Sequence, residues 1–211
     1  MNAQAADAPR VDEAAGTVTY EQPLAERMRT FLRLEFLAQQ ANHHSLQAST
    51  WSSRAAIGSL LEILTILGRG DIRGEVLKEL ERQASNLAPY VSRPGVDKSR
   101  LETLLERVSD LRVQLAEVGA HYAQPLKESE FLSAIKHRSA IPGGTCEFDL
   151  PDFKHWLSLP YEHRVADFQL WFKTIKPLCD SVAQVLWLTR ESAKGQPQIA
   201  SHGLFQHALE R

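Results

Sequence analysis

Residues Arg138–Pro160, RSAIPGGTCEFDLPDFKHWLSLP, form the one long interruption between two sets of amphipathic helical segments. The PGG sequence at 142–144 disfavours a helix and permits the positive φ angles of a tight turn. Polar and apolar residues then alternate over 145–150, which predicts a short strand that ends at the next proline. Asp152 can cap one further helical turn before the segment closes.

Apolar residues recur at helical spacing on both sides of this interruption. The predicted helices cover approximately residues 23–43, 50–67, 72–91, 97–118, 128–138, 162–176 and 177–189. The N-caps expected for the second, third and fourth of these helices are Ser49 or Thr50, Asp71, and Asp97 or Ser99. The predicted fold class is mainly α, a helical bundle with a small and incomplete antiparallel β element around 141–151 and 199–208.

These boundaries divide the chain into five parts. The first 17 residues are rich in Ala, Asp and Gln and contain no apolar run of the kind found in signal peptides. We expect a disordered tail over 1–17, a helical domain over 18–140, a β and loop segment over 141–159, helices returning to the bundle over 160–194, and the remnant of a strand region over 195–211. The segment 141–159 is called the pivot below.

Charge balance and cysteine content narrow the class of protein. The 24 basic and 26 acidic residues give a net charge of −2, so no overall positive field attracts the chain to nucleic acid or to a membrane. Two cysteines, Cys146 and Cys179, do not make a disulfide framework. No apolar run reaches the roughly 18 residues that a spanning helix needs. We therefore expect a cytoplasmic protein without membrane insertion.

The first predicted helix, 23–43, is apolar on almost every side apart from a narrow arginine-bearing stripe. Glu35 falls in the middle of its apolar face. A buried carboxylate needs a basic partner or a set of hydrogen-bond donors. We therefore expect Glu35 to pair with a cation of another helix, with Lys78 or Arg82 as the nearest candidates.

Residues that could carry chemistry do not combine into a catalytic or metal site. Cys146 follows two glycines and has His155 nearby, but a cysteine on a short strand is more often buried and inert than nucleophilic. The eight histidines are scattered, and the adjacent His43 and His44 cannot share one helical face. The glycine pair lacks the surrounding fingerprint of a phosphate loop. We expect no enzymatic activity, no metal and no cofactor.

Four cations on the predicted helices permit a further hypothesis, and they are Arg29, Arg33, Lys78 and Arg82. Mixed charges at i,i+3 and i,i+4 spacing usually form a solvated helix face. The alternative is a helical nucleic-acid-binding module, or another protein-interaction module, that uses these four side chains. Their acidic neighbours and the slightly negative net charge argue against binding to nucleic acid.

Several stretches of the sequence resemble one family. They are Pro23-Leu24, ERMRT at 26–30, LRLE at 32–35, LKELERQ at 77–83, IPGGTCEFDLP at 141–151 and Trp156-Leu157. Together they look like the ZapD family of bacterial cell-division proteins, and the resemblance spans about residues 20–205. Family members usually carry His two residues before this tryptophan, where the present chain has Lys154 followed by His155. They also continue into a further strand-rich segment, so we expect a smaller β element here.

The resemblance implies a cytoplasmic, non-enzymatic scaffold that concentrates at the division site. Members of the family bind the C-terminal tail of the tubulin-like protein FtsZ. As homodimers they crosslink and bundle FtsZ filaments. For dimerisation of this chain, surplus apolar surface is expected on the 23–43 helix and around Trp171 and Trp187.

The expected partner site combines cations with the aromatic residues of the pivot. An extended peptide that is partly apolar and partly acidic fits a groove with an aromatic floor and a few fixed cations. The candidates to gather around Phe153 and Trp156 are Arg33, Arg138, Lys154 and His155. Arg33 and Arg138 have an alternative role, which is to tie the pivot to the bundle through Glu35, Glu147 or Asp149, and for Arg138 this role is equally good. The remaining candidates, Arg29, Lys78 and Arg82, form a second face to consider.

Overall fold

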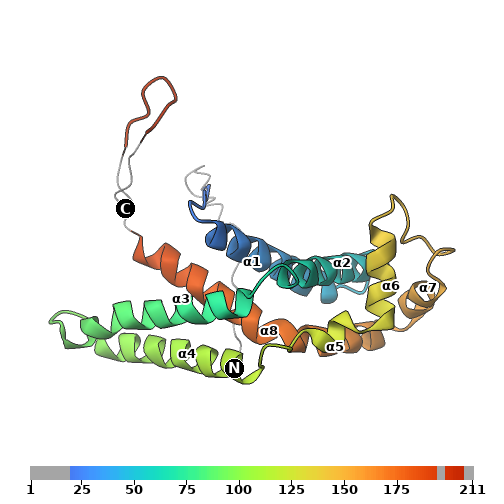
Figure 1. The fold of residues 1–211 in the computed structure, drawn as a ribbon, viewed down its shortest axis with the longest axis horizontal. Helices are drawn as coiled ribbons and strands as arrows, with labels where there is room; N and C mark the ends of the chain where they lie inside the picture. Colours follow the sequence, from blue (N-terminus) through green and yellow to red (C-terminus); the bar gives the residue numbers. More distant parts are fainter. Residues whose placement is uncertain (1–19, 194–197, 207–211) are drawn as a thin grey trace.

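The computed structural model describes residues 20–193 and 198–206. The tail expected over 1–17 lies outside these ranges, as do residues 194–197 and 207–211. The described helices are α1 (Glu26–Ser45), α2 (Thr50–Leu67), α3 (Ile72–Leu87), the 3₁₀ helix η1 (Ala88–Ser92), α4 (Lys98–Glu117), α5 (Gln124–Lys127), α6 (Glu130–Ser139), α7 (Pro151–Ser158) and α8 (Tyr161–Ser192). The prediction of a mainly α protein is confirmed (Figure 1).

Local sequence signals set the starts of three long helices. The side chain of Ser49 accepts a hydrogen bond from the α2 backbone at 3.2 Å, and Asp97 does the same for α4 at 3.1 Å. Asp71 accepts from the amide of Gly74 at 2.9 Å and caps α3. A Cβ atom at position 74 would lie too close to the Asp71 carboxylate in its present rotamer, so a larger residue there would require this side chain to shift. These caps are among those that the sequence predicts.

Helix α8 connects the two ends of the molecule. It has 32 residues and packs against α1, α2, α3 and α4, the helices of both long hairpins (Figure 1). Its buried apolar side chains belong to a single hydrophobic core and include Phe168, Phe172, Ile175, Leu178, Val182 and Val185. No described helix, α8 included, is both long enough and apolar enough to cross a membrane.

The two helices predicted for 162–176 and 177–189 are in fact one, because Pro177 lies inside α8. A proline in a helix interior removes one backbone donor and crowds the preceding turn, at a cost of about 3 kcal/mol. On either side of this position, Ile175 and Leu178 are fully buried, and burying each such side chain contributes about 1.5–3 kcal/mol. Tertiary packing therefore outweighs the local helix-breaking signal.

The pivot contains turns in place of the predicted strand at 145–150. Gly143 has a φ of +71°, and the amide of Gly144 donates to the carbonyl of Ile141 at 2.8 Å. A Cβ atom on Gly144 would collide with the carbonyl oxygen of Arg138, so the second glycine allows a close backbone approach. The strand prediction is wrong here because the backbone forms local turn hydrogen bonds, and the part of the chain that the structure describes contains no strand that could pair with it.

The second predicted strand segment, 199–208, is only partly described. Within residues 198–206 the sole β feature is an isolated antiparallel bridge between Ser201 and Leu204. The backbone at His202 and Gly203 has positive φ, as the turn between the bridged residues requires. Within the described residues, the expected β element is therefore reduced to this bridge, and no strand forms.

Glu35 pairs with a cation of another helix, as expected, but the partner is Arg190. The guanidinium of Arg190 donates to both carboxylate oxygens of Glu35, at 2.8 and 2.7 Å. It also holds Glu21, which precedes α1, at 2.6 and 2.9 Å. The two carboxylates raise the pKa of Arg190, and Arg190 lowers the pKa of Glu21. Lys78 and Arg82 are not the partners because α8, and not α3, packs along this face of α1.

We expect the substitution Pro177→Ala to stabilise the protein. Alanine restores the missing backbone donor and removes the ring from the interior of α8, so the free energy of unfolding should rise by about 1–3 kcal/mol. Urea unfolding followed by circular dichroism measures this change. Leu178→Ala, one residue away, serves as the reference and should lose about 2–5 kcal/mol. A loss of stability in Pro177→Ala would contradict the explanation given for the continuity of α8.

Candidate partner-binding site

The structure separates the expected site residues into two groups. One group lies on the pivot and at the end of α6, and it comprises Arg138, Phe153, Lys154, His155 and Trp156. The other lies on α1 and α3, and it comprises Arg29, Arg33, Lys78 and Arg82. Arg33 is twelve residues before the end of α1, about 18 Å along the helix axis, so it does not join the cations of the pivot.

The aromatic residues of the pivot belong to the core. Phe153 and Trp156 are only 3% and 7% exposed. They form a cluster with Phe131 of α6 and Trp171 of α8, in which neighbouring ring centroids lie 5.6–6.1 Å apart. The indole nitrogen of Trp156 donates to Asp167 at 3.0 Å. These rings fix α7 against α6 and α8, and they offer a partner little surface.

Lys154 of the pivot and Arg138, at the end of α6, are balanced by carboxylates of the pivot. Lys154 lies 2.8 Å from Glu147 and lowers the pKa of that carboxyl group. Arg138 lies 3.7 Å from Asp149, which is the tying role that the sequence left open for it. His155 is exposed and has no ion-pair partner within the described residues.

Sequence reasoning missed the residue that joins α2 to the pivot. Arg54 donates to the carbonyl oxygen of Thr145 at 2.8 Å, and its guanidinium lies 4.9 Å from the ring centroid of Phe153. Trp51, one turn earlier on α2, is 77% exposed and lies 5.7 Å from the same guanidinium. Nothing in the periodicity of α2 marks Arg54, because its partners are about 90 residues away in sequence.

The second group is organised by a buried carboxylate. The side chain of Glu79 on α3 is fully buried, and it pairs with Arg27 of α1 at 3.1 Å and with Arg82 of its own helix. Glu79 therefore raises the pKa of Arg82 and fixes two guanidinium groups where α1 meets α3. Neither Arg27 nor the organising role of Glu79 was predicted.

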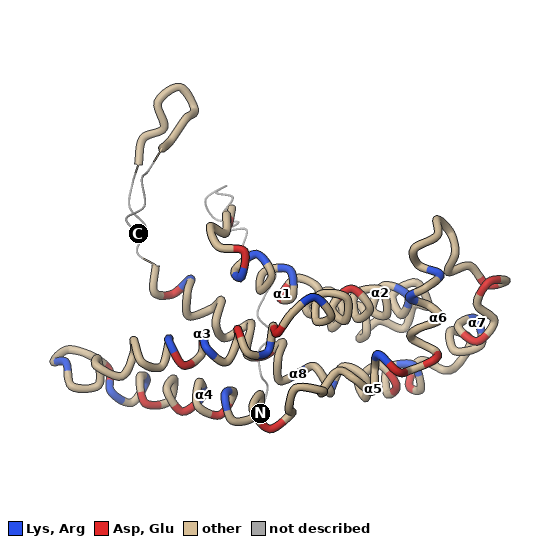
Figure 2. Tube along the Cα trace, viewed as in Figure 1, with Lys and Arg blue, Asp and Glu red and all other residues tan. Residues whose placement is uncertain are grey.

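The other cations of this face are exposed. Arg29 pairs with Glu26 of its own helix at 3.3 Å. Arg33 and Lys78 have no ion pair within the described parts of the chain. Two uncompensated cations thus lie on the same two helices as the arginines held by Glu79. Figure 2 marks positions of Lys and Arg in blue along both of these helices.

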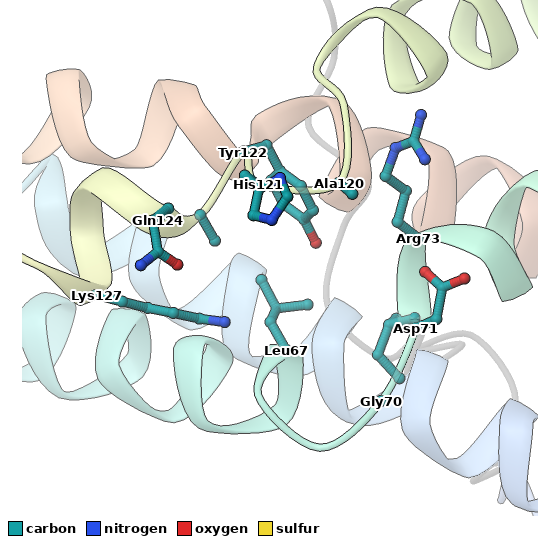
Figure 3. A pocket seen from close by; sticks show the side chains of 11 residues that line it. Leu67, Gly70, Asp71, Arg73, Ala120, His121, Tyr122, Gln124 and Lys127 are labelled. Atoms are coloured by element: carbon teal, nitrogen blue, oxygen red, sulfur yellow. The ribbon is translucent and has the colours of Figure 1, made fainter.

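A small cavity lies where α2, α3 and the link from α4 to α5 meet (Figure 3). Its volume is about 130 Å³, and its lining includes His121, Tyr122 and Lys127. Burial raises the pKa of Tyr122. Arg73, at its edge, is occupied in donating to the last carbonyls of α4 at 2.8 and 2.7 Å. The cavity contains no nucleophile paired with a base.

The remaining candidates for chemistry also lack partners. The thiol of Cys146 lies 3.5 Å from a carboxylate oxygen of Asp149, which is a poor base for a thiol, and no contact joins it to His155 within the described residues. Among the described residues, no group of three or more His, Cys, Asp or Glu side chains could hold a metal ion. What the described surface does offer is exposed cations, together with the exposed ring of Trp51 beside Arg54.

A comparison with protein families identifies the family of this chain. The model of the family described as "ZapD: Cell division protein" matches residues 32–211. The chain belongs to the ZapD family. The ZapD match includes Arg33, the α3 face, the whole pivot and α8, and it begins after Arg27 and Arg29. ZapD proteins are cell division proteins and not a known family of enzymes, which favours a protein partner for these surfaces.

We expect Glu79→Gln to destabilise the protein. The amide keeps the shape of the side chain but loses both charge-assisted interactions with Arg27 and Arg82, so the free energy of unfolding should fall by about 1–3 kcal/mol. Chemical denaturation measures the difference. Glu75→Gln, an exposed position on the same helix, is the control and should change stability by less than about 0.5 kcal/mol. An unchanged stability in Glu79→Gln would mean that the pairs only offset the cost of burying the carboxylate.

The two thiols should differ sharply in reactivity. Burial raises the pKa of Cys179 to about 12, whereas Cys146 is partly exposed. A thiol reagent such as DTNB at pH 8 should therefore modify Cys146 in the native protein and Cys179 only after unfolding. Mass spectrometry of the modified peptides identifies each site, and Cys146→Ser should remove the fast phase. Rapid modification of native Cys179 would show that the core around α8 opens readily.

Proposed function

We propose that this protein binds the C-terminal tail of FtsZ and, as a homodimer, crosslinks and bundles FtsZ filaments at the division septum in the cytoplasm. The proposal rests on membership of the ZapD family and on the exposed cations described above. The observation that supports the proposal most strongly is the group of cations on α1 and α3. Arg33 and Lys78 have no ion pair among the described residues, and the same two helices carry the two arginines held by the buried Glu79.

This face suits an acidic peptide. Arginine is the preferred cation for carboxylates because its planar guanidinium can donate two parallel hydrogen bonds. Glu79 occupies only part of the donor set of Arg27 and Arg82, whose side chains remain 42% and 54% exposed. A partner carboxylate can therefore bind the outward donors without first breaking the buried pairs.

The pivot supplies a second set of contacts. Lys154 and Arg138 are paired, but their side chains are 59% and 48% exposed. An incoming carboxylate competes there with Glu147 and Asp149 in water, where ion pairs contribute only about 0–1 kcal/mol. Each single contact is thus weak. A dimer that binds many tails along two filaments can bind tightly through avidity, although each single contact is weak.

Nucleic acid is the alternative ligand for the same cations. Binding to duplex DNA would fall steeply with salt, because each neutralised phosphate releases counterions. The carboxylates of Glu26, Glu75 and Glu81 on the same helices oppose such binding. Parallel salt titrations with a tail peptide and with duplex DNA distinguish the two ligands.

Charge reversal tests the proposed site. Arg33→Glu and Lys154→Glu should each weaken tail binding tenfold or more, because each reversal removes an attractive contact and also places a carboxylate opposite the carboxylates of the tail. Co-sedimentation with FtsZ polymers and peptide titration measure the effect. Lys173→Glu, which reverses an exposed cation on α8, is the matched control and should bind normally. Circular dichroism should show unchanged helical content in all three variants.

Two results would contradict the proposal. If both reversals bind and bundle as the unmodified protein does, the tail contacts neither of these cations. If the protein binds duplex DNA more tightly than the tail peptide at physiological salt, the helical nucleic-acid-binding hypothesis replaces the proposal.

A further inference from the structure

A groove between α4 and α8 has no occupant within the described chain. Its volume is about 490 Å³, and it is lined by Arg100, Thr103, Leu104, Arg107, Gln184 and Trp187. Leu104 and Trp187 give it an apolar floor, and no acidic side chain is part of its lining. The groove therefore presents apolar surface together with positive charge.

One side chain in this groove has an unused hydrogen-bond donor. Gln184 is only 8% exposed, and its carbonyl oxygen accepts from Arg107 at 3.0 Å. Its amide nitrogen is buried and has no hydrogen-bond partner within the described residues. Such a donor is costly to leave unsatisfied, so it points to an acceptor that the described residues of one chain do not provide. Arg100 likewise has no ion pair in the described ranges.

The same molecule carries a segment of matching chemistry. Phe148, in the loop between α6 and α7, is 86% exposed, which is unusual for a phenylalanine in a chain with a large core. Glu147 and Asp149 flank it on either side. Both carboxylates are paired within their own chain, Glu147 with Lys154 and Asp149 with Arg138, and such solvent-accessible pairs can exchange partners. The loop therefore offers an aromatic ring and two exchangeable carboxylates to an apolar groove that carries two arginines and a buried amide donor.

The loop and the groove cannot meet within one chain. The groove residues of α4 lie in the half of that helix next to the turn from η1, and this turn and the loop between α6 and α7 are at opposite ends of the molecule (Figure 1). A contact between them requires two chains. In a two-fold dimer each copy could place its loop in the groove of the other, which gives two identical contacts in one closed particle.

We infer that the Glu147–Asp149 loop of one copy docks in the α4–α8 groove of a second copy, with Phe148 on Leu104 and Trp187. The carboxylates of the loop then face Arg100 and Arg107, and the loop supplies the acceptor that the amide of Gln184 lacks. This inference rests on the proposed dimerisation and assigns an interface to it. The inferred interface includes Trp187, which lies in one of the two regions where the sequence predicts surplus apolar surface. It does not include the exposed side of α1, which is the other region.

Sedimentation velocity over a range of concentrations tests the inference with single substitutions. Phe148→Ser should raise the dissociation constant of the dimer at least tenfold, and so should Thr103→Glu, which places a carboxylate in the groove. Both positions are exposed, so neither change should affect folding. Phe36→Ser is the matched control, because it removes an aromatic ring that is 62% exposed on α1. It should leave the dimer unchanged.

A crosslinking experiment tests the contact directly. In a Cys146→Ser background, chains carrying Phe148→Cys and chains carrying Thr103→Cys are mixed under mild oxidation with oxidised glutathione. A disulfide-linked pair that needs both substitutions is the expected product, and each variant alone should yield almost none. Cys179 is buried and does not interfere.

The outcomes separate this inference from the proposed function. A dimer that survives Phe148→Ser and Thr103→Glu but dissociates in Phe36→Ser overturns the inference and moves the interface to α1, while dimerisation itself stands. A chain that is monomeric at every concentration overturns both the inference and the proposed dimer. A tail-peptide titration of the Phe148→Ser protein tests the proposed function separately. The affinity of each protomer for the peptide should equal that of the unmodified protein, because the substitution removes only a dimer contact.

Discussion

Burial of one long helix from both sides is the constraint on which this structure depends. Helix α8 supplies the common core for the α1–α2 and α3–α4 hairpins, and its buried side chains run from Phe168 to Leu188. Because the same helix also packs Trp171 against the aromatic cluster of the pivot, the position of the pivot is set by the core as well. A surface made of separate segments is thereby held on one rigid support, which is what a scaffold protein requires.

How freely a surface cation can bind a partner depends on whether the carboxylate that neutralises it is buried or exposed. A fully buried carboxylate, such as Glu79, fixes its arginines because without them its negative charge would be unpaired in the core. A carboxylate in water, such as Glu147, holds its lysine only loosely. The face of α1 and α3 is therefore preorganised, whereas the cations of the pivot are free to exchange partners. The two faces would contribute differently to binding, one through fixed geometry and the other through adaptability.

Features encoded within a few residues were predictable from the sequence, and features encoded over long separations were not. The caps at Ser49, Asp71 and Asp97 depend on neighbours two or three residues away, and all three form as expected. The strand at 145–150 and the break at Pro177 were wrong, because a strand needs a pairing partner and a proline can be overridden by packing. The same limit explains the unexpected partner of Glu35 and the missed roles of Arg27, Arg54 and Glu79: each depends on a contact between distant segments.

The ion triad of Arg190 with Glu21 and Glu35 has a consequence for how this protein can change over evolution. One guanidinium serves two carboxylates that are 169 and 155 positions away in the chain. Lysine offers a point charge without a fork, so it cannot reproduce both bidentate contacts at once. Loss of the arginine leaves two like charges side by side, and loss of both glutamates leaves a cation at the end of α8 without neighbours. Substitutions at these three positions should therefore be inherited together, as one covarying unit that ties the start of the chain to the end of its longest helix.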